Sequence, residues 1–120
     1  MAAPPPKPKN DLAEAQRLLR FALLGSKVVR KTQADYPEDA PKVEKFIRDT
    51  IATLAPNAFV HVAPQEYEDG TTIDADVYAI RNKEGAWYIK FCMKNGRVTI
   101  LSCHKPLWPL TRIDGRTILP

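Results

Sequence analysis

The chain has 120 residues, of which 44% are hydrophobic and 27% are charged. This length suits one domain and is too short for two ordinary ones, and the composition excludes a disordered chain. No apolar run approaches the roughly 18 residues of a membrane span, and the N-terminus has no apolar segment of a secretory signal. We therefore predict a cytoplasmic protein without a membrane partner. The formal net charge of +4 favours polyanionic partners, nucleic acid first.

The N-terminal segment differs in composition from the rest of the chain. Residues 1–9 carry four of the 11 prolines and two lysines, which is typical of a solvated arm that leans towards polyproline II. We predict that residues 1–10 form a flexible arm and that residues 11–120 form a single α+β domain.

Two helices are expected in the first half of this domain. Asp11 can cap the first helix, with Glu14 completing a capping-box pair, and Gly25 can end it. Asp39 can cap the second helix, with Pro41 in its first turn. Both segments carry apolar residues at helical spacing: Leu12, Ala15, Leu19, Ala22 and Leu23 in the first, and Val43, Phe46, Ile47, Thr50, Ile51 and Leu54 in the second.

A basic stretch accompanies the first helix and continues beyond its expected end. These residues could form an edge that contacts phosphates or an ordinary solvated face, and the sequence leaves both interpretations open. They are Arg17, Arg20, Lys27, Arg30 and Lys31.

The second half of the domain is expected to form an antiparallel sheet. Asn95-Gly96 is a two-residue turn of the type favoured in hairpins, and it is the strongest local signal in the sequence. We predict two N-terminal helices packed on a four-stranded antiparallel sheet. Four segments have the composition of strands: residues 59–62, 73–81, 86–94 and 97–105. After Pro106 the chain should be irregular, with a tail packed onto the domain through Trp108, Leu110, Ile113 and Leu119.

The Asn95-Gly96 turn fixes the pairing of the last two strands, and the pairing decides which side chains share a face. In this register Lys90 opposes Leu101 and Tyr88 opposes Cys103. Cations and an aromatic ring on an open sheet face suit single-stranded RNA, because cations meet phosphates and a ring can stack on a base. The partly open face is predicted to carry Tyr88, Lys90, Lys94, Arg97 and Lys105.

The same register has consequences for other side chains. His104 pairs with Trp87 and so faces the helices, unless the strand bends before Pro106. Cys92 and Cys103 share one face at a separation of about 13 Å, which is too far for a disulfide, so we predict two buried thiols.

No metal-ligand spacing is present among the two cysteines and two histidines, so we predict no metal site and no cofactor. Asp74 and Asp76 stand on one face of a predicted strand. They could hold a divalent ion, but such a pair is more often a solvated strand edge.

Cleavage of RNA without metal needs few groups. One removes the proton of the 2′-hydroxyl, another protonates the leaving 5′-oxygen, and a cation stabilises the phosphate. The candidate catalytic residues for these roles are Tyr88, Lys90, His104 and Lys105. Structural roles remain open for the first three: a sheet aromatic, an edge lysine and a packed strand-end histidine. Candidate nucleic-acid-binding residues are Arg81, Lys94, Arg97 and Arg112.

Three segments between residues 76 and 105 resemble a known family. They are Asp76-Val77-Tyr78, Trp87-Tyr88-Ile89-Lys90-Phe91 and the run RVTILSCHK at residues 97–105. Together they resemble the C-terminal half of the motility quorum-sensing regulator family of mRNA-interferase toxins, and more broadly the barnase–EndoU–colicin–RelE nuclease superfamily. Ala75 stands where that family has a glutamine, and the N-terminal arm and the tail after Lys105 are additions.

The resemblance implies a RelE-like fold and a toxin that cleaves mRNA without metal and is silenced by a cognate antitoxin protein. Tyr88 would match the family's active-site tyrosine and Lys105 its C-terminal lysine. The first hypothesis is therefore a metal-independent endoribonuclease toxin that acts on single-stranded RNA. The second is a non-catalytic RNA- or protein-binding module on the same scaffold, and a third is an interaction protein that pairs through the strand edge at residues 59–62.

Overall fold

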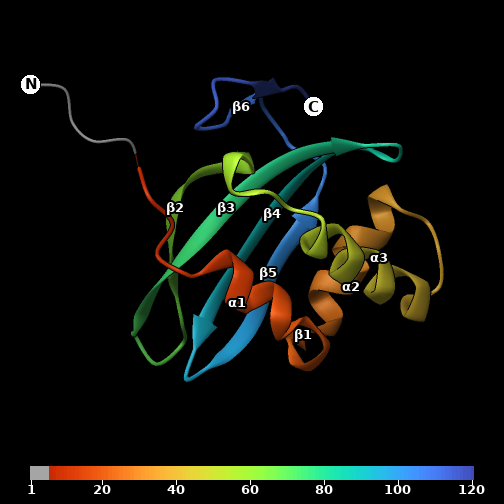
Figure 1. The fold of residues 1–120 in the computed structure, drawn as a ribbon. Helices are drawn as coiled ribbons and strands as arrows, with labels where there is room; N and C mark the ends of the chain where they lie inside the picture. Colours follow the sequence, from red (N-terminus) through yellow and green to blue (C-terminus); the bar gives the residue numbers. More distant parts are fainter. Residues whose placement is uncertain (1–5) are drawn as a thin grey trace, which may run out of the picture.

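Five strands form one mixed sheet in the order β1-β5-β4-β3-β2 (Figure 1). The computed structural model describes residues 6–120. Neighbouring strands are antiparallel, except that β1 pairs in parallel with β5. The strands are β1 (Leu23–Leu24), β2 (Phe59–Glu66), β3 (Thr72–Asn82), β4 (Gly85–Lys94) and β5 (Arg97–His104).

Helices pack against one face of this sheet and share a core with it (Figure 1). This confirms the predicted α+β class. The structure differs from the prediction in detail, because it adds the short strand β1 and one helix to the expected four strands and two helices. Within residues 6–120 the helices are α1 (Leu12–Arg17), α2 (Ser26–Asp35) and α3 (Ala40–Ala52), with 3-10 turns η1 (Leu19–Phe21) and η2 (Pro56–Ala58).

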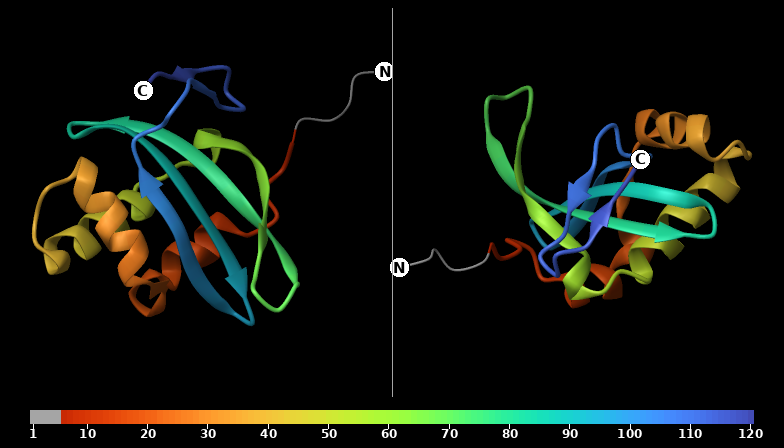
Figure 2. Two further views of the ribbon diagram at one scale, coloured as in Figure 1. Left: turned by 180° about the vertical axis from the view of Figure 1, so that it is seen from behind. Right: turned by 90° about the horizontal axis from the view of Figure 1, so that it is seen from above.

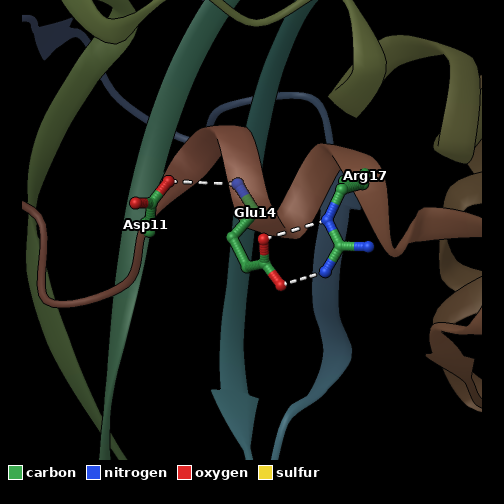
Figure 3. Close-up of polar contacts among 3 residues, drawn as sticks. All are labelled: Asp11, Glu14 and Arg17. Carbon is green, nitrogen blue, oxygen red and sulfur yellow. Dashed lines mark hydrogen bonds and ion pairs between the residues drawn. The ribbon is translucent and has the colours of Figure 1, made fainter.

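Helix α1 begins as predicted but ends early. Asp11 caps it, since its Oδ1 accepts a hydrogen bond from the backbone N–H of Glu14 at 3.0 Å (Figure 3). The Glu14 carboxylate pairs with Arg17 rather than completing the predicted capping box (Figure 3). After Arg17 the chain passes through η1 into β1, so the apolar residues that follow serve a turn and an edge strand instead of a continuous helix.

Helix α2 was not expected from the sequence. Gly25, expected to end the first helix, instead precedes α2. The helix buries little, chiefly Val29 and Thr32, so its apolar pattern is weak. It is held along β5 by polar contacts, because the Thr32 hydroxyl donates to the Cys103 carbonyl at 2.6 Å and Asp35 accepts from the backbone N–H of Lys105 at 2.9 Å.

The core between helices and sheet is aromatic. Trp87 is fully buried, and the ring of Phe46 from α3 meets it edge-on at 4.9 Å. Tyr78 and Phe91 stack at 5.6 Å on neighbouring strands. Burial of a large apolar side chain contributes roughly 1.5–3 kcal/mol to stability, so these contacts hold the helices on this face of the sheet. A functional site on the sheet would therefore lie on the opposite face.

The end of the N-terminal arm is docked between two strands. The Asp76 carboxylate accepts the backbone N–H groups of Lys9 and Asn10, both at 2.8 Å. The Asn10 side-chain amide donates to the Asp74 carbonyl at 3.2 Å and accepts from the backbone N–H of Met93 at 2.9 Å. Asn10 thus bridges β3 and β4 just beyond the last residue pair of their ladder. The part of the predicted arm that contacts the domain therefore includes Lys9 and Asn10. Residues 1–5 of the predicted arm lie outside the described residues.

A small hairpin stands over one end of the open sheet face (Figure 2). It consists of β6 (Leu110–Thr111) and β7 (Thr117–Ile118). Leu110 and Ile118 pack against Ala79 and Ala86 of the sheet. The expectation of an irregular tail is therefore wrong, because part of the tail forms this hairpin. The expected packing holds for Leu110, but it is wrong for Trp108, Ile113 and Leu119, whose side chains are exposed.

Candidate active site

A β-bulge in β5 changes the predicted register of the last hairpin. The pairing follows the prediction from the turn up to Phe91, which opposes Ile100. The next residue of β4, Lys90, opposes Ser102 rather than Leu101, which is left without a partner. Because successive side chains alternate between faces, one extra residue moves every following side chain of β5 to the other face.

The bulge changes the face of the sheet on which His104 lies. His104 opposes Tyr88, and the two rings stack with centroids 5.0 Å apart and planes 16° apart. The prediction that His104 faces the helices beside Trp87 is therefore wrong. Lys105 lies beyond the end of β5, with its side chain beside Gly85.

The phase of the strand pattern could have revealed the bulge. Val98 and Ile100 are apolar at alternate positions, as expected for one buried face. Further along, however, Cys103 is the apolar residue, and its neighbours Ser102 and His104 are polar. A change of phase within a strand is the signature of an inserted residue.

The bulge also separates the two cysteines, which the predicted register placed on one face. Cys103 belongs to the core beneath the helices, whereas the Cys92 sulfur lies 3.7 Å from the Tyr67 hydroxyl. Both thiols are free and buried, as predicted. Burial raises the pKa of Cys92, and it raises the pKa of Cys103 to about 12.

We expect neither thiol of the folded protein to react readily with an aromatic disulfide reagent at mildly alkaline pH. The reactive species is the thiolate, and burial both disfavours and shields it. Absorbance of the released thiolate measures the reaction, and the same protein in denaturant should release two equivalents. Rapid modification of Cys92 or Cys103 without denaturant would contradict this burial.

A pocket of about 240 Å³ lies where β4, the end of β5 and the segment before β6 meet. Three of the four predicted catalytic residues, Tyr88, Lys90 and His104, are brought together in it, whereas Lys105 is not among its lining residues. The lining is completed by Lys31, Ser102, Pro106, Leu107, Trp108 and Leu110. A larger, more open groove of about 530 Å³ between α3 and the β3–β4 turn contains none of the predicted catalytic residues.

The contacts of His104 fix its tautomer. Its Nδ1 lies 2.8 Å from the carbonyl oxygen of Lys105, and a carbonyl can only accept. Nδ1 therefore carries the hydrogen of the neutral ring, which leaves Nε2 as the free basic nitrogen. Stacking on Tyr88 holds the plane of the imidazole.

Two lysines make the pocket electropositive. Lys90 comes from β4 and Lys31 from α2. Burial lowers the pKa of Lys90, and the charge of Lys31 lowers it further. Burial raises the pKa of the Tyr88 hydroxyl, so this group stays protonated at neutral pH. The pocket thus combines cations, a proton donor and an imidazole.

Two of the four predicted nucleic-acid-binding residues make contacts at the β6–β7 hairpin: Arg81 reaches it from β3, and Arg112 lies between β6 and β7. Arg81 donates to the Leu119 carbonyl at 2.8 Å. Arg112 is ion-paired with Asp114, and its side chain is only 10% exposed. The structure therefore places both outside the pocket, with contacts that secure the hairpin.

The other two, Lys94 and Arg97, flank the Asn95-Gly96 turn at the far end of the hairpin. Lys94 lies over the ring of Tyr67, 4.5 Å from its centroid. Arg97 donates from Nε to the Phe21 carbonyl at 3.2 Å. Lys94 lies four positions along β4 from Lys90, or about 13 Å, so only a longer ligand could reach it from the pocket.

Lys31, Ser102 and Trp108 line the pocket although they were not predicted as site residues. Lys31 belongs to the basic stretch that could contact phosphates. It lies beside β5 because it is part of α2, a helix that the sequence analysis did not predict. Ser102 joins the pocket because of the bulge, which also moves His104.

The predicted pair Asp74 and Asp76 does not form an open carboxylate site. Asp76 is fully buried, and both its oxygens accept N–H groups of the arm. Across residues 6–120 no group of three or more His, Cys, Asp or Glu is arranged to hold a metal ion. None of the helices described is long and apolar enough to cross a membrane.

The chain was compared with known proteins at three levels. No protein-family model matches it. Neither a curated protein nor a solved structure matches it significantly.

Proposed function

We propose that the protein is a metal-independent endoribonuclease that cleaves single-stranded RNA, on a RelE-like scaffold. The observation that carries the proposal is the bulge in β5, which places His104 against Tyr88 in a pocket that also holds Lys90. An imidazole, a phenol and an ammonium are the kinds of group that metal-free phosphodiester cleavage requires.

In the proposed reaction the 2′-oxygen of RNA bonds to phosphorus and the bond to the 5′-oxygen breaks, which leaves a 2′,3′-cyclic phosphate. Nε2 of His104 accepts the proton of the 2′-hydroxyl, and the Tyr88 hydroxyl donates its proton to the leaving oxygen. Lys90 and Lys31 stabilise the charge that develops on the phosphate. Transfer of a proton from His104 to Tyr88, through solvent, restores the starting state.

The proposal includes a toxin role with a cognate antitoxin protein as partner. Helices that precede an antiparallel run of strands, together with the resemblance of residues 76–105, support this role. Induced expression in a bacterial host should arrest growth, and co-expression of the antitoxin should restore it. Normal growth with abundant protein would argue against a toxin.

The purified protein should cleave single-stranded RNA in the presence of EDTA, and Tyr88→Phe should slow the cleavage by at least about tenfold, because the proton donor is lost. Gel analysis of a labelled oligonucleotide measures the rate. Tyr67→Phe is the matched control, since Tyr67 lies on the same sheet face near Cys92 and outside the pocket, and it should leave the rate unchanged.

Intact RNA after prolonged incubation would count against the nuclease. The alternative is a non-catalytic RNA-binding module, which the two lysines of the pocket also favour. In that case RNA should be retained uncut in a salt-sensitive way, and Lys90→Ala should weaken the retention.

A further inference from the structure

Trp108 is an exposed aromatic residue at the edge of the pocket. It lines the pocket, yet 62% of its surface is accessible, although the sequence suggested that it would pack onto the domain. Its neighbour Leu107 is 76% exposed. Large apolar side chains exposed next to a polar site often mark a place where a ligand binds.

The position of Trp108 is fixed by its neighbours in the chain. Pro106 and Leu110 are both buried, so the chain is held on either side of Trp108. Pro109 restricts the backbone directly after it. The backbone that carries the indole is thus held on both sides, while the ring itself stays open to a ligand.

The charges around Trp108 indicate the kind of ligand. Lys31 and Lys90 line the same pocket, and none of the lining residues in the described chain is acidic. Cations beside an exposed aromatic ring are the arrangement with which proteins bind single-stranded nucleic acid, because a base stacks on the ring while its phosphate meets the cations.

We infer that Trp108 is a base-stacking residue for single-stranded RNA, and that it holds the nucleotide next to the phosphate bound by Lys31 and Lys90. The inference rests on the proposed function, which identifies single-stranded RNA as the ligand. It concerns binding only, so it can be tested without cleavage.

The test uses a single-stranded 2′-O-methyl RNA oligonucleotide, which lacks the attacking hydroxyl and cannot be cut. The chain has two tryptophans, and Trp87 is fully buried, so quenching on binding reports Trp108. The oligonucleotide should quench the fluorescence of the native protein.

Trp108→Ala should weaken the affinity of the protein for the oligonucleotide about tenfold, and Trp108→Phe should weaken this affinity less, because a ring remains. Ile113→Ala is the control and should change the affinity by less than about twofold, since this exposed apolar side chain lies outside the pocket.

Binding without quenching, equal affinity of Trp108→Ala and the native protein, or no binding at low salt would each overturn the inference. The outcome is independent of catalysis. If the native protein cuts ordinary RNA while Trp108→Ala binds the oligonucleotide normally, the nuclease stands and the stacking role falls. If it cuts nothing but Trp108→Ala binds weakly, the nuclease falls and the stacking role stands. Thermal unfolding of each variant verifies that it is folded.

Discussion

Replacing His104 with alanine should slow RNA cleavage at least about a hundredfold, because the reaction loses its general base. The Nδ1 of His104 is hydrogen-bonded to the Lys105 carbonyl, so Nε2 is the nitrogen that accepts the proton in the proposed reaction. The alanine variant lacks this nitrogen. The initial rate of cleavage of a labelled oligonucleotide in EDTA measures the effect. His104→Gln should be equally slow, since an amide is polar but does not take up a proton at neutral pH.

His61→Ala provides the matched control for this variant. His61 is the other histidine of the chain, and it lies exposed on β2, outside the pocket. Its replacement should leave the rate unchanged. A His104→Ala protein that is folded and cleaves as fast as the native one would exclude the imidazole as the base.

Replacing Asp76 with alanine should lower the free energy of unfolding by about 3 kcal/mol. The carboxylate is fully buried and accepts the backbone N–H groups of Lys9 and Asn10 together with the Asn10 side-chain amide. Hydrogen bonds to a charged group are among the stronger ones, and the variant leaves their donors without a partner. Urea titration followed by circular dichroism measures the loss.

Two further variants separate the role of Asp76 from a general effect of charge. Asp74→Ala removes an exposed carboxylate from the same strand, while its backbone carbonyl still accepts from Asn10, so stability should change by less than about 0.5 kcal/mol. Asn10→Ala should cost about 2 kcal/mol, because β3 and β4 lose the amide that bridges them. Equal losses for Asp74→Ala and Asp76→Ala would contradict the docking of the arm.

The main elements of the fold could be predicted because their signals are local. Asp39 and Pro41 begin α3 as expected, and Asn95-Gly96 forms the expected turn between β4 and β5. Helix α2 could not be predicted in this way. Its stability depends on Thr32 reaching the Cys103 carbonyl, a contact between residues 71 positions apart.

The site could be predicted only in part, for a related reason. The sequence indicates that Tyr88 and Lys90 share an open face, since both lie on the regular strand β4. It does not place His104 beside them, because that depends on the unpaired Leu101 in β5. The sequence does not place Lys31 and Trp108 in the pocket, since both come from segments whose position is set by packing onto the sheet.

The docking of Asn10 has a consequence for the order in which the chain acquires its structure during synthesis. The amide side chain of Asn10 bonds to Met93, which follows it by 83 positions. Ribosomes add roughly 5–20 residues per second, so about 4–17 s pass between the appearance of the two residues. On the nascent chain Asn10 must therefore remain unattached to β4 until Met93 has been made. The first described residues to be synthesised are thus among the last to be fixed in place.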